Sequence, residues 1–274
     1  MNDVPTVTLS HGTAMPRVGL GTWPMDDAEA ERTVGHALEL GYRLIDTAEN
    51  YRNETGVGRA LRQGPRAEVF VTSKFNKRWH SVDGVRTAFE ASAEKLGVDY
   101  LDLLLIHWPN PDQDQYVEAW QGLIALREAG LVKAIGTSNF KPTQLQRLID
   151  ETGIAPEVNQ VQLSPVWAKP AEREFHAAHG IVTEAWSPLG KGTDLLDNPI
   201  VQEIAKDHGR TPGQVVLRWA TQQDVVPIPK SADPDRLAEN LTVFDFDLSP
   251  DQLATLTALD GTGKAAADSD RFGH

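Results

Sequence analysis

The chain has 274 residues, of which 40% are hydrophobic and 24% are charged. This composition is ordinary for a soluble globular protein with a substantial core, so it excludes a disordered or fibrous chain. The net charge of −13 argues against a nucleic-acid partner, and the lack of cysteine excludes disulfides, thiol catalysis, zinc fingers and iron–sulfur clusters.

No segment of the sequence reads as a targeting or membrane segment. The first residues lack the basic and apolar regions of a signal peptide. The most apolar run, residues 101–106, contains Asp102 and is far too short to span a bilayer. We therefore expect a cytoplasmic protein.

Short apolar runs alternate with amphipathic stretches along the chain. The runs are mostly continuous rather than alternating, which is typical of strands covered on both faces in a parallel sheet. They predict strands at Val18–Leu20, Arg43–Ile45, Val69–Thr72, Leu101–Ile106, Val132–Gly136, Glu157–Val161, Ile181–Ala185 and Val225–Ile228.

The stretches between these runs carry helix signals. Val85, Phe89 and Leu96 recur on one helical face, and so do Val117, Trp120 and Ile124. Thr211 before proline and Ser249 with Gln252 read as N-caps. Glycines follow four of the helical stretches, where a left-handed residue ends a helix: Gly41, Gly97, Gly130 and Gly180.

About eight strand–helix units without a break in composition predict a (β/α)₈ barrel, formed as a single domain over residues 1–274. Residues 7–12 suggest a small hairpin closing the bottom of the barrel, and the tail after Asp260 is expected to be irregular. A doubly wound fold is the alternative. Its glycine fingerprint is only approximated by residues 56–61, where Leu61 replaces the third glycine and no strand directly precedes.

Titratable residues gather at the ends of three consecutive predicted strands. Asp46 follows the second strand with Tyr51 in its loop, Lys74 follows the third, and His107 follows the fourth. Any one of them alone would read as a helix cap or a structural residue. Because barrel chemistry is located at the carboxyl ends of the strands, we expect the four side chains to meet on one rim.

These four side chains suit the reduction of a carbonyl group. Tyrosine has a pKa near 10, and a nearby Lys74 ammonium would favour the phenolate and lower that pKa. Asp46 would keep Lys74 charged, and His107 would bind the carbonyl oxygen from the other side. Together they would protonate that oxygen as a hydride reaches its carbon.

A metal site is the competing interpretation of this rim. Asp46 and His107 are possible ligands, but no second histidine follows a strand and Lys74 would repel a cation. His176 and His179 lie within a helical stretch without a carboxylate partner set, so we expect them to be surface or packing residues. The sequence thus predicts no metal.

The sequence resembles the aldo-keto reductase family, and within it the bacterial 2,5-diketo-D-gluconate reductase branch. The resemblance extends from Val7 to about Asp260. It rests on five motifs in order: GYRLIDTAENYRNETGVGRAL at 41–61, LDLLLIHWP at 101–109, GLVKAIGTSNF at 130–140, VNQVQLSP at 158–165 and IPKSADPDRLAEN at 228–240. It implies an NADPH-dependent oxidoreductase that reduces aldehydes or ketones to alcohols.

The resemblance also implies a role for each matched residue. Tyr51 would be the proton donor, Lys74 and Asp46 its modulators, and His107 the group that orients the substrate carbonyl. The nicotinamide carboxamide would be held by Ser138, Asn139 and Gln160, its ring by Trp186, and its ribose by Thr22 and Asp46. Ser187 and Leu189 complete the cofactor contacts expected at this end of the site.

The segment after the eighth strand is expected to hold the 2′-phosphate of NADPH. By resemblance, Lys230, Ser231 and Arg236 bind the phosphate, with Glu239 and Asn240 near the adenine. Two cations and a hydroxyl suit a dianionic phosphate. Asp233 departs from the pattern of close relatives, and its charge would weaken the preference for NADPH, which is compatible with some use of NADH.

Aromatic residues in the expected rim loops are candidates for the substrate pocket: Trp23, Trp79, Trp108 and, with them, Asn110. Trp120 and Trp219 lie in helical stretches and are expected to pack in the core.

Diketogluconate, small dicarbonyl aldehydes and small ketoesters all remain open as substrates. A cofactor-binding regulatory subunit and a metal-dependent hydrolase are the alternative functions, and we expect a monomer.

Overall fold

Eight parallel strands follow one another around the sheet in the computed structural model, which describes residues 4–273. Each overlaps a predicted strand, but most continue further at the carboxyl end because backbone pairing extends beyond the apolar run into the polar residues. The strands are β3 (Leu20–Gly21), β4 (Leu44–Asp46), β5 (Phe70–Phe75), β6 (Leu101–Ile106), β7 (Val132–Ser138), β8 (Val158–Gln162), β9 (Val182–Trp186) and β10 (Val225–Ile228).

The sheet closes on itself between its first and last strands. The amides of Gly19 and Gly21 donate to the carbonyls of Pro227 and Pro229, each at 3.1 Å. These bonds join the β3 segment to β10, and the remaining strands pair in sequence order. The predicted (β/α)₈ barrel is therefore confirmed.

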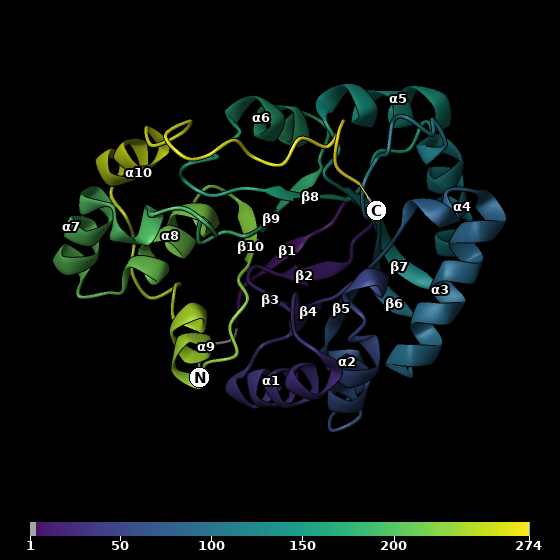
Figure 1. The fold of residues 1–274 in the computed structure, drawn as a ribbon, viewed down its shortest axis with the longest axis horizontal. Coiled ribbons are helices and arrows are strands. Elements are labelled where there is room, and N and C mark those ends of the chain that lie inside the picture. The colour runs from purple at the N-terminus through teal and green to yellow at the C-terminus, as the bar shows by residue number, and fades with distance from the viewer. Residues whose placement is uncertain (1–3, 274) are drawn as a thin grey trace.

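The hairpin predicted at the amino terminus is present. It consists of β1 (Thr6–Thr8) paired antiparallel with β2 (Ala14–Pro16), and Figure 1 shows it in the centre of the ring of helices. Leu9 and Met15 from this region pack with inward residues of the barrel strands, including Leu103, Leu105 and Val226. The hairpin thus seals the amino-terminal end of the barrel with apolar side chains.

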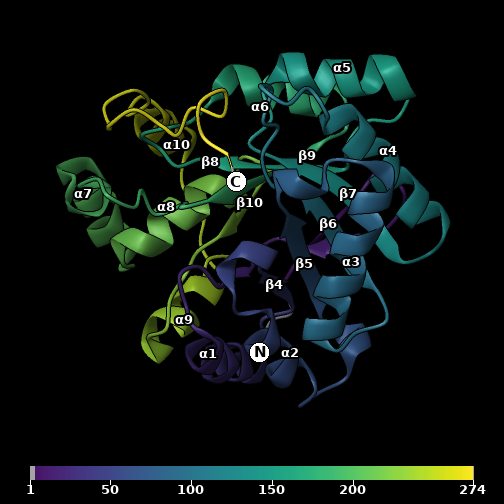
Figure 2. The ribbon, with the colours of Figure 1, turned by 45° about the vertical axis from the view of Figure 1, so that its right-hand side comes forward.

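The helices surround the sheet, as the views in Figures 1 and 2 show. They are α1 (Asp27–Leu40), α2 (Glu54–Leu61), α3 (Val82–Leu96), α4 (Tyr116–Glu128), α5 (Pro142–Thr152), α6 (Pro170–Ala178), α7 (Pro199–His208), α8 (Pro212–Thr221), α9 (Pro234–Leu241) and α10 (Pro250–Thr257). Short 3₁₀ turns are η1 (Glu49–Tyr51), η2 (Arg66–Glu68), η3 (Lys77–Trp79) and η4 (Leu195–Asp197).

The predicted helix ends are confirmed. Thr211 and Ser249 each form a capping box with the glutamine three residues later. The four predicted glycines all have positive φ, between +67° and +110°. Because these positions set where each helix stops, they also set where each following strand begins.

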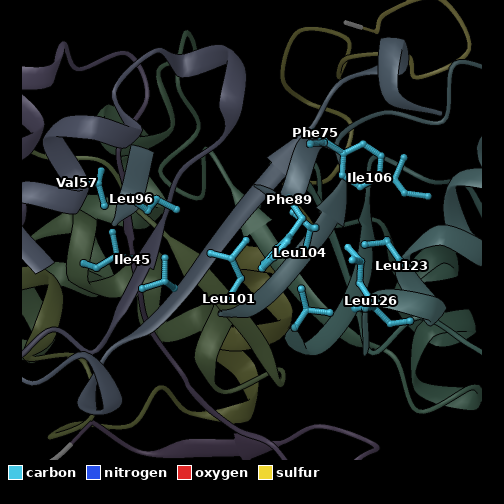
Figure 3. Close-up of a cluster of buried hydrophobic side chains, with 14 of the residues drawn as sticks. Ile45, Val57, Phe75, Phe89, Leu96, Leu101, Leu104, Ile106, Leu123 and Leu126 are labelled. Atoms are coloured by element: carbon cyan, nitrogen blue, oxygen red, sulfur yellow. The ribbon is translucent and has the colours of Figure 1, made fainter. Parts of the chain in front are cut away.

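The predicted apolar faces pack between the helices and the sheet. Figure 3 shows Phe89 and Leu96 of α3 with Leu101 and Leu104 of β6 in one buried cluster. Trp120 and Trp219 are fully buried, and each indole N–H finds an oxygen acceptor at about 3 Å. Both tryptophans are therefore packing residues, as predicted.

The glycine motif at residues 56–61 has a packing role. It lies inside α2, where a side chain at Gly56 would collide with the backbone of Asp27 in α1. A side chain at Gly58 would likewise collide with the backbone of Leu96 at the end of α3. The glycines allow three helices to approach closely, so the motif does not mark a doubly wound nucleotide fold.

The chain after Asp260 runs without helix or strand through residue 273, as expected. Within residues 4–273, none of the helices has both the length and the apolar character needed to cross a bilayer. The expectation that the first residues form no signal peptide includes residues 1–3, which lie outside the described residues.

Candidate active site

A cleft of about 770 Å³ opens at the carboxyl ends of the strands. Its wall is built by strand ends and by the loops that follow them, so residues far apart in sequence meet there. Predicted site residues make up most of this wall: Trp23, Asp46, Tyr51, His107, Trp108, Ser138, Asn139, Gln160, Trp186, Ser187, Leu189 and Lys230.

A second cavity, of about 960 Å³, lies at the opposite end of the barrel. It is lined by residues of the hairpin, the end of α1 and the end of α9, such as Thr6, Gly41 and Leu241. None of the predicted catalytic residues lines it. Despite its larger volume, we place the chemistry in the cleft at the strand carboxyl ends.

Lys74 and Asp46 form a buried ion pair at the base of the cleft. The Lys74 ammonium donates to Asp46 Oδ1 at 2.6 Å and to the Thr47 carbonyl at 3.0 Å, and both side chains are almost fully buried. Burial alone would lower the pKa of Lys74, but Asp46, Tyr51 and Glu184 outweigh it and raise that pKa. Lys74 therefore stays a cation at any working pH.

Tyr51 lies on η1 with its hydroxyl 3.4 Å from the Lys74 ammonium. Burial raises the pKa of Tyr51, the Lys74 charge lowers it, and Asp46 raises it again. The fall in this pKa that the sequence predicts from Lys74 alone is therefore not the net result. The net shift is upward, because the phenol loses more hydration than a single neighbouring ammonium compensates.

His107 faces Tyr51 across the cleft. The two rings meet edge to face with their centroids 5.8 Å apart, and both residues line the cleft. The backbone carbonyl of His107 accepts a hydrogen bond from Asn139 Nδ2 at 3.1 Å. A carbonyl oxygen placed between Tyr51 and His107 would therefore meet polar groups from two sides.

Gln160 connects the ion pair to a carboxyl group that the sequence analysis missed. Its amide nitrogen donates to Asp46 Oδ2 at 2.8 Å and to Glu184 Oε2 at 2.6 Å. Glu184 lies next to Gln160 in the β8–β9 pairing and is fully buried. The signal was present in the sequence, because an acidic residue within a buried strand run rarely occurs without a partner.

The residues assigned to the nicotinamide form one connected group. Asn139 Nδ2 donates to Ser138 Oγ at 3.0 Å, and Trp186 Nε1 donates to Asn139 Oδ1 at 2.8 Å. Thr22 is fully buried, with its hydroxyl donating to the Asp46 carbonyl at 3.0 Å. Thr22 does not line the cleft, so its assignment to the ribose stays a prediction.

One rim of the cleft is formed by the loop after β9. Ser187 and Leu189 line it, and so does Lys191, which the sequence analysis did not single out. The Lys191 ammonium lies 3.9 Å from the ring centroid of Trp23, whose surface is 51% exposed. Trp23 and Lys191 therefore meet across the mouth of the cleft through a cation–π contact.

The residues assigned to the phosphate surround the amino terminus of α9. Lys230 lines the cleft and pairs with Glu29 at 3.3 Å, while Ser231 Oγ accepts from the amide of Asp233 at 3.1 Å. Asp233 is the N-cap of α9, and Oδ1 accepts from the amide of Arg236. The Arg236 side chain is exposed, and its assignment to the phosphate stays a prediction.

Glu239 and Asn240 lie one to two turns further along α9. Glu239 is partly exposed, whereas Asn240 is buried with its side chain against the Tyr42 hydroxyl. Neither side chain lines the cleft. Their assignment to the adenine stays a prediction.

Two of the four substrate-pocket candidates lie away from the cleft wall. Trp79 Nε1 donates to Glu49 Oε2 at 2.7 Å, and Asn110 Nδ2 donates to the Trp108 carbonyl at 3.0 Å. Trp23 and Trp108 do line the cleft. Gly273 packs against the Asn110 side chain, so the carboxyl-terminal tail, which the sequence analysis did not connect to the site, reaches the same loop.

Metal ligation finds no support in the residues described. Within residues 4–273, no group of three or more histidine, aspartate or glutamate side chains is arranged to hold an ion. His176 is fully buried and bonded to Asn159 and Thr183, and His179 stacks on Phe175. Both histidines are packing residues.

Comparison with known proteins agrees with this geometry. The family described as "Aldo/keto reductase family" matches residues 9–261. Methylglyoxal reductase DkgA of Yersinia pestis is 45% identical over 100% of this chain and 99% of its own length. The 2,5-diketo-D-gluconic acid reductase B of Corynebacterium sp. is 47% identical over 95% of each chain. A mutant of Gox0644, solved in complex with NADPH, is 43% identical with a TM-score of 0.95, covering 100% of both chains.

Proposed function

The chain belongs to the aldo/keto reductase family, and on that premise we propose that Tyr51 is the proton donor in an NADPH-dependent reduction of aldehyde or ketone carbonyls to alcohols. The observation that carries the proposal is the buried Asp46–Lys74–Tyr51 chain at the base of the cleft. Its contacts are 2.6 Å and 3.4 Å long, and Tyr51 opens onto the space where a substrate can bind.

The residues at the cleft fit NADPH. Two amides and a hydroxyl are placed for the carboxamide: Ser138 ends β7, Asn139 follows it, and Gln160 lies within β8. Lys230 and Arg236 supply positive charge at the start of α9 for a phosphate. NADPH, when bound, supplies the hydride for the carbonyl carbon, and Trp186 would hold its ring against the wall.

The proton takes a separate path from the hydride. The substrate oxygen lies between the Tyr51 hydroxyl and the His107 ring. As the carbonyl carbon gains a hydride, the Tyr51 O–H bond breaks and its proton moves to the carbonyl oxygen, leaving a phenolate. The Lys74 ammonium, held by Asp46, stabilises that phenolate, and His107 donates to the developing alkoxide.

The substrate is a small carbonyl compound, and the named relatives support diketogluconate or methylglyoxal-like dicarbonyls as first choices. Trp23 and Trp108 provide apolar walls for it. The proton-transfer residues require no metal. A cytoplasmic monomer with a single domain over residues 1–274 remains our proposal from the sequence.

Replacing Tyr51 with phenylalanine tests the proton-donor assignment. Because general acid catalysis contributes about 10²–10⁴-fold, we expect Tyr51→Phe to lower kcat by that factor. The dissociation constant for NADPH, measured by quenching of tryptophan fluorescence, should stay within about two-fold. Wild-type turnover in the variant would refute the assignment.

A substrate panel separates the enzyme from a regulatory subunit. The wild-type protein is incubated with NADPH and a set of aldehydes, ketones and dicarbonyls, and the loss of NADPH absorbance is followed. We expect turnover with at least one class. Tight NADPH binding with no turnover across the panel would favour the regulatory function instead.

A further inference from the structure

Glu184 is a buried carboxyl group that the mechanism above does not use. It is fully buried in β9, inside the barrel, beside the two charged residues of the active site. Its Oε2 accepts from Gln160, and no hydrogen-bond partner for Oε1 is found within residues 4–273. A carboxyl group held in the interior without a cation of its own calls for an explanation.

The bonds of Gln160 give the first part of that explanation. A side-chain amide has two N–H donors on one nitrogen, and here that nitrogen contacts both Asp46 and Glu184. With both donors directed at carboxyl oxygens, the amide oxygen is the part of Gln160 left to face the cleft that this residue lines. If Asp46 were the only acceptor, the Gln160 side chain could turn either its oxygen or its nitrogen toward the cleft.

The charges give the second part. Asp46 on β4, Lys74 on β5 and Tyr51 on η1 are the titratable groups that act on Glu184 or respond to it. One ammonium balances one carboxylate. Burial and the Asp46 charge raise the pKa of Glu184 to about 8. Near neutral pH Glu184 is therefore protonated and neutral, and the Lys74 ammonium is neutralised by the Asp46 carboxylate alone.

From this geometry we propose that Glu184 is a positioning residue for the reaction, which together with Asp46 fixes the Gln160 amide and which sets the charge felt by Tyr51. The inference rests on the proposed function of Tyr51. When Glu184 ionises, its negative charge opposes formation of the Tyr51 phenolate and raises the pKa of Tyr51. The proton donor thereby stays protonated to higher pH.

Glu184→Gln is the informative variant. The glutamine side chain is nearly the same size, and its oxygen can still accept from Gln160, but it cannot ionise. Without the Glu184 charge, the pKa of Tyr51 should fall. We therefore expect the alkaline limb of the plot of kcat/KM against pH, for carbonyl reduction, to move to lower pH by about one unit. For the same reason, the acid limb of alcohol oxidation with NADP⁺ should move in the same direction.

Glu184→Met tests the positioning part, because methionine fills the space without accepting a hydrogen bond. We expect a several-fold weaker binding of NADPH in this variant, and recovery to within about two-fold of wild type in Glu184→Gln. The matched control is Glu157→Gln, a change at another fully buried carboxyl group, bonded to Arg127 and the Ile135 amide near the other end of the barrel. It should lower stability without moving either limb.

One outcome would overturn the inference and leave the proposed function intact. In it, Glu184→Gln is folded and its pH profiles match those of the wild type, while Tyr51→Phe is inactive. Equal shifts of the limbs in Glu184→Gln and Glu157→Gln would also overturn it. Full turnover in Tyr51→Phe would refute the proposed function itself, whatever the pH profiles show.

Discussion

Tyr51 holds its proton more tightly than a tyrosine in water, because burial raises its pKa and the Lys74 ammonium offsets only part of that rise. A phenol that stays protonated across the working pH range is suited to donate a proton rather than to accept one. The same ammonium is needed after the proton leaves, when it faces a phenolate. At the scale of the residue, burial and charge therefore act at different stages of one reaction.

Arg236 carries the prediction on cofactor choice at this scale. Its exposed guanidinium at the start of α9 is assigned to the phosphate that distinguishes NADPH from NADH. We expect Arg236→Ala to weaken NADPH binding about ten-fold, since a charge-assisted hydrogen bond contributes about 1.5–3 kcal/mol, and to leave NADH binding nearly unchanged. Dissociation constants for the two cofactors are measured side by side. Equal losses would contradict the assignment.

At the scale of the element, the amino terminus of α9 needs an N-cap and is also the predicted phosphate site. Asp233 caps the helix by accepting from the Arg236 amide at 3.1 Å, and its carboxylate also places negative charge beside the predicted phosphate site. An N-cap of this kind stabilises a helix by about 1 kcal/mol. The residue therefore favours the helix and disfavours a dianionic ligand.

Asp233→Asn separates the two effects, because asparagine caps a helix as well as aspartate but carries no charge. We expect NADPH binding to tighten about two- to five-fold, while NADH binding and the melting temperature stay nearly constant. Fluorescence titration with each cofactor and a thermal melt provide the measurements. If NADPH binding does not tighten, Asp233 lies too far from the phosphate to influence the choice of cofactor.

The irregular tail is held to the barrel by its own contacts. Lys141 at the start of α5 pairs with Asp268 and Asp270, and the Ala267 amide donates to Gln162 Oε1 at 2.7 Å. These contacts bring the end of the chain to the loop of Trp108 and Asn110. A segment without regular structure is thereby held against a loop that borders the cleft.

At the scale of the whole molecule, two buried histidines make stability depend on pH. Burial lowers the pKa of His80 and of His176 from 6.5 to about 4. Between pH 6.5 and about 4, these two histidines bind protons in the unfolded chain but not in the folded chain. The free energy of unfolding therefore falls as the pH is lowered through this range. Each histidine contributes up to about 3 kcal/mol to this loss, which is complete below pH 4.

His80→Phe tests the contribution of one of them. Neither ring nitrogen of His80 has a hydrogen-bond partner within residues 4–273, so phenylalanine should be tolerated at pH 7 and should flatten the loss of stability in acid. Urea unfolding at several pH values between about 7 and 4 measures both effects. His36→Gln, on an exposed face of α1, is the control and should leave the slope unchanged. An unchanged slope in His80→Phe would show that this ring does not titrate with unfolding.

The sequence by itself determined the barrel, its hairpin and the rim on which Asp46, Tyr51, Lys74 and His107 meet. It could do so because apolar runs, caps and glycines act locally, and because parallel strands bring their carboxyl ends to one side. The predicted ends of three strands, at Ile45, Thr72 and Gly136, were too early. The strands end at Asp46, Phe75 and Ser138, because backbone pairing continues where the apolar pattern stops.

Only the tertiary structure decided which polar side chains touch. The Gln160 contacts to Asp46 and Glu184 join β4, β8 and β9, and the Lys191–Trp23 contact joins two loops that are distant in sequence. The Trp79 indole likewise donates to Glu49, which comes from a different loop. Loop direction and buried hydrogen bonding depend on partners from other segments, and local sequence patterns carry no record of those partners.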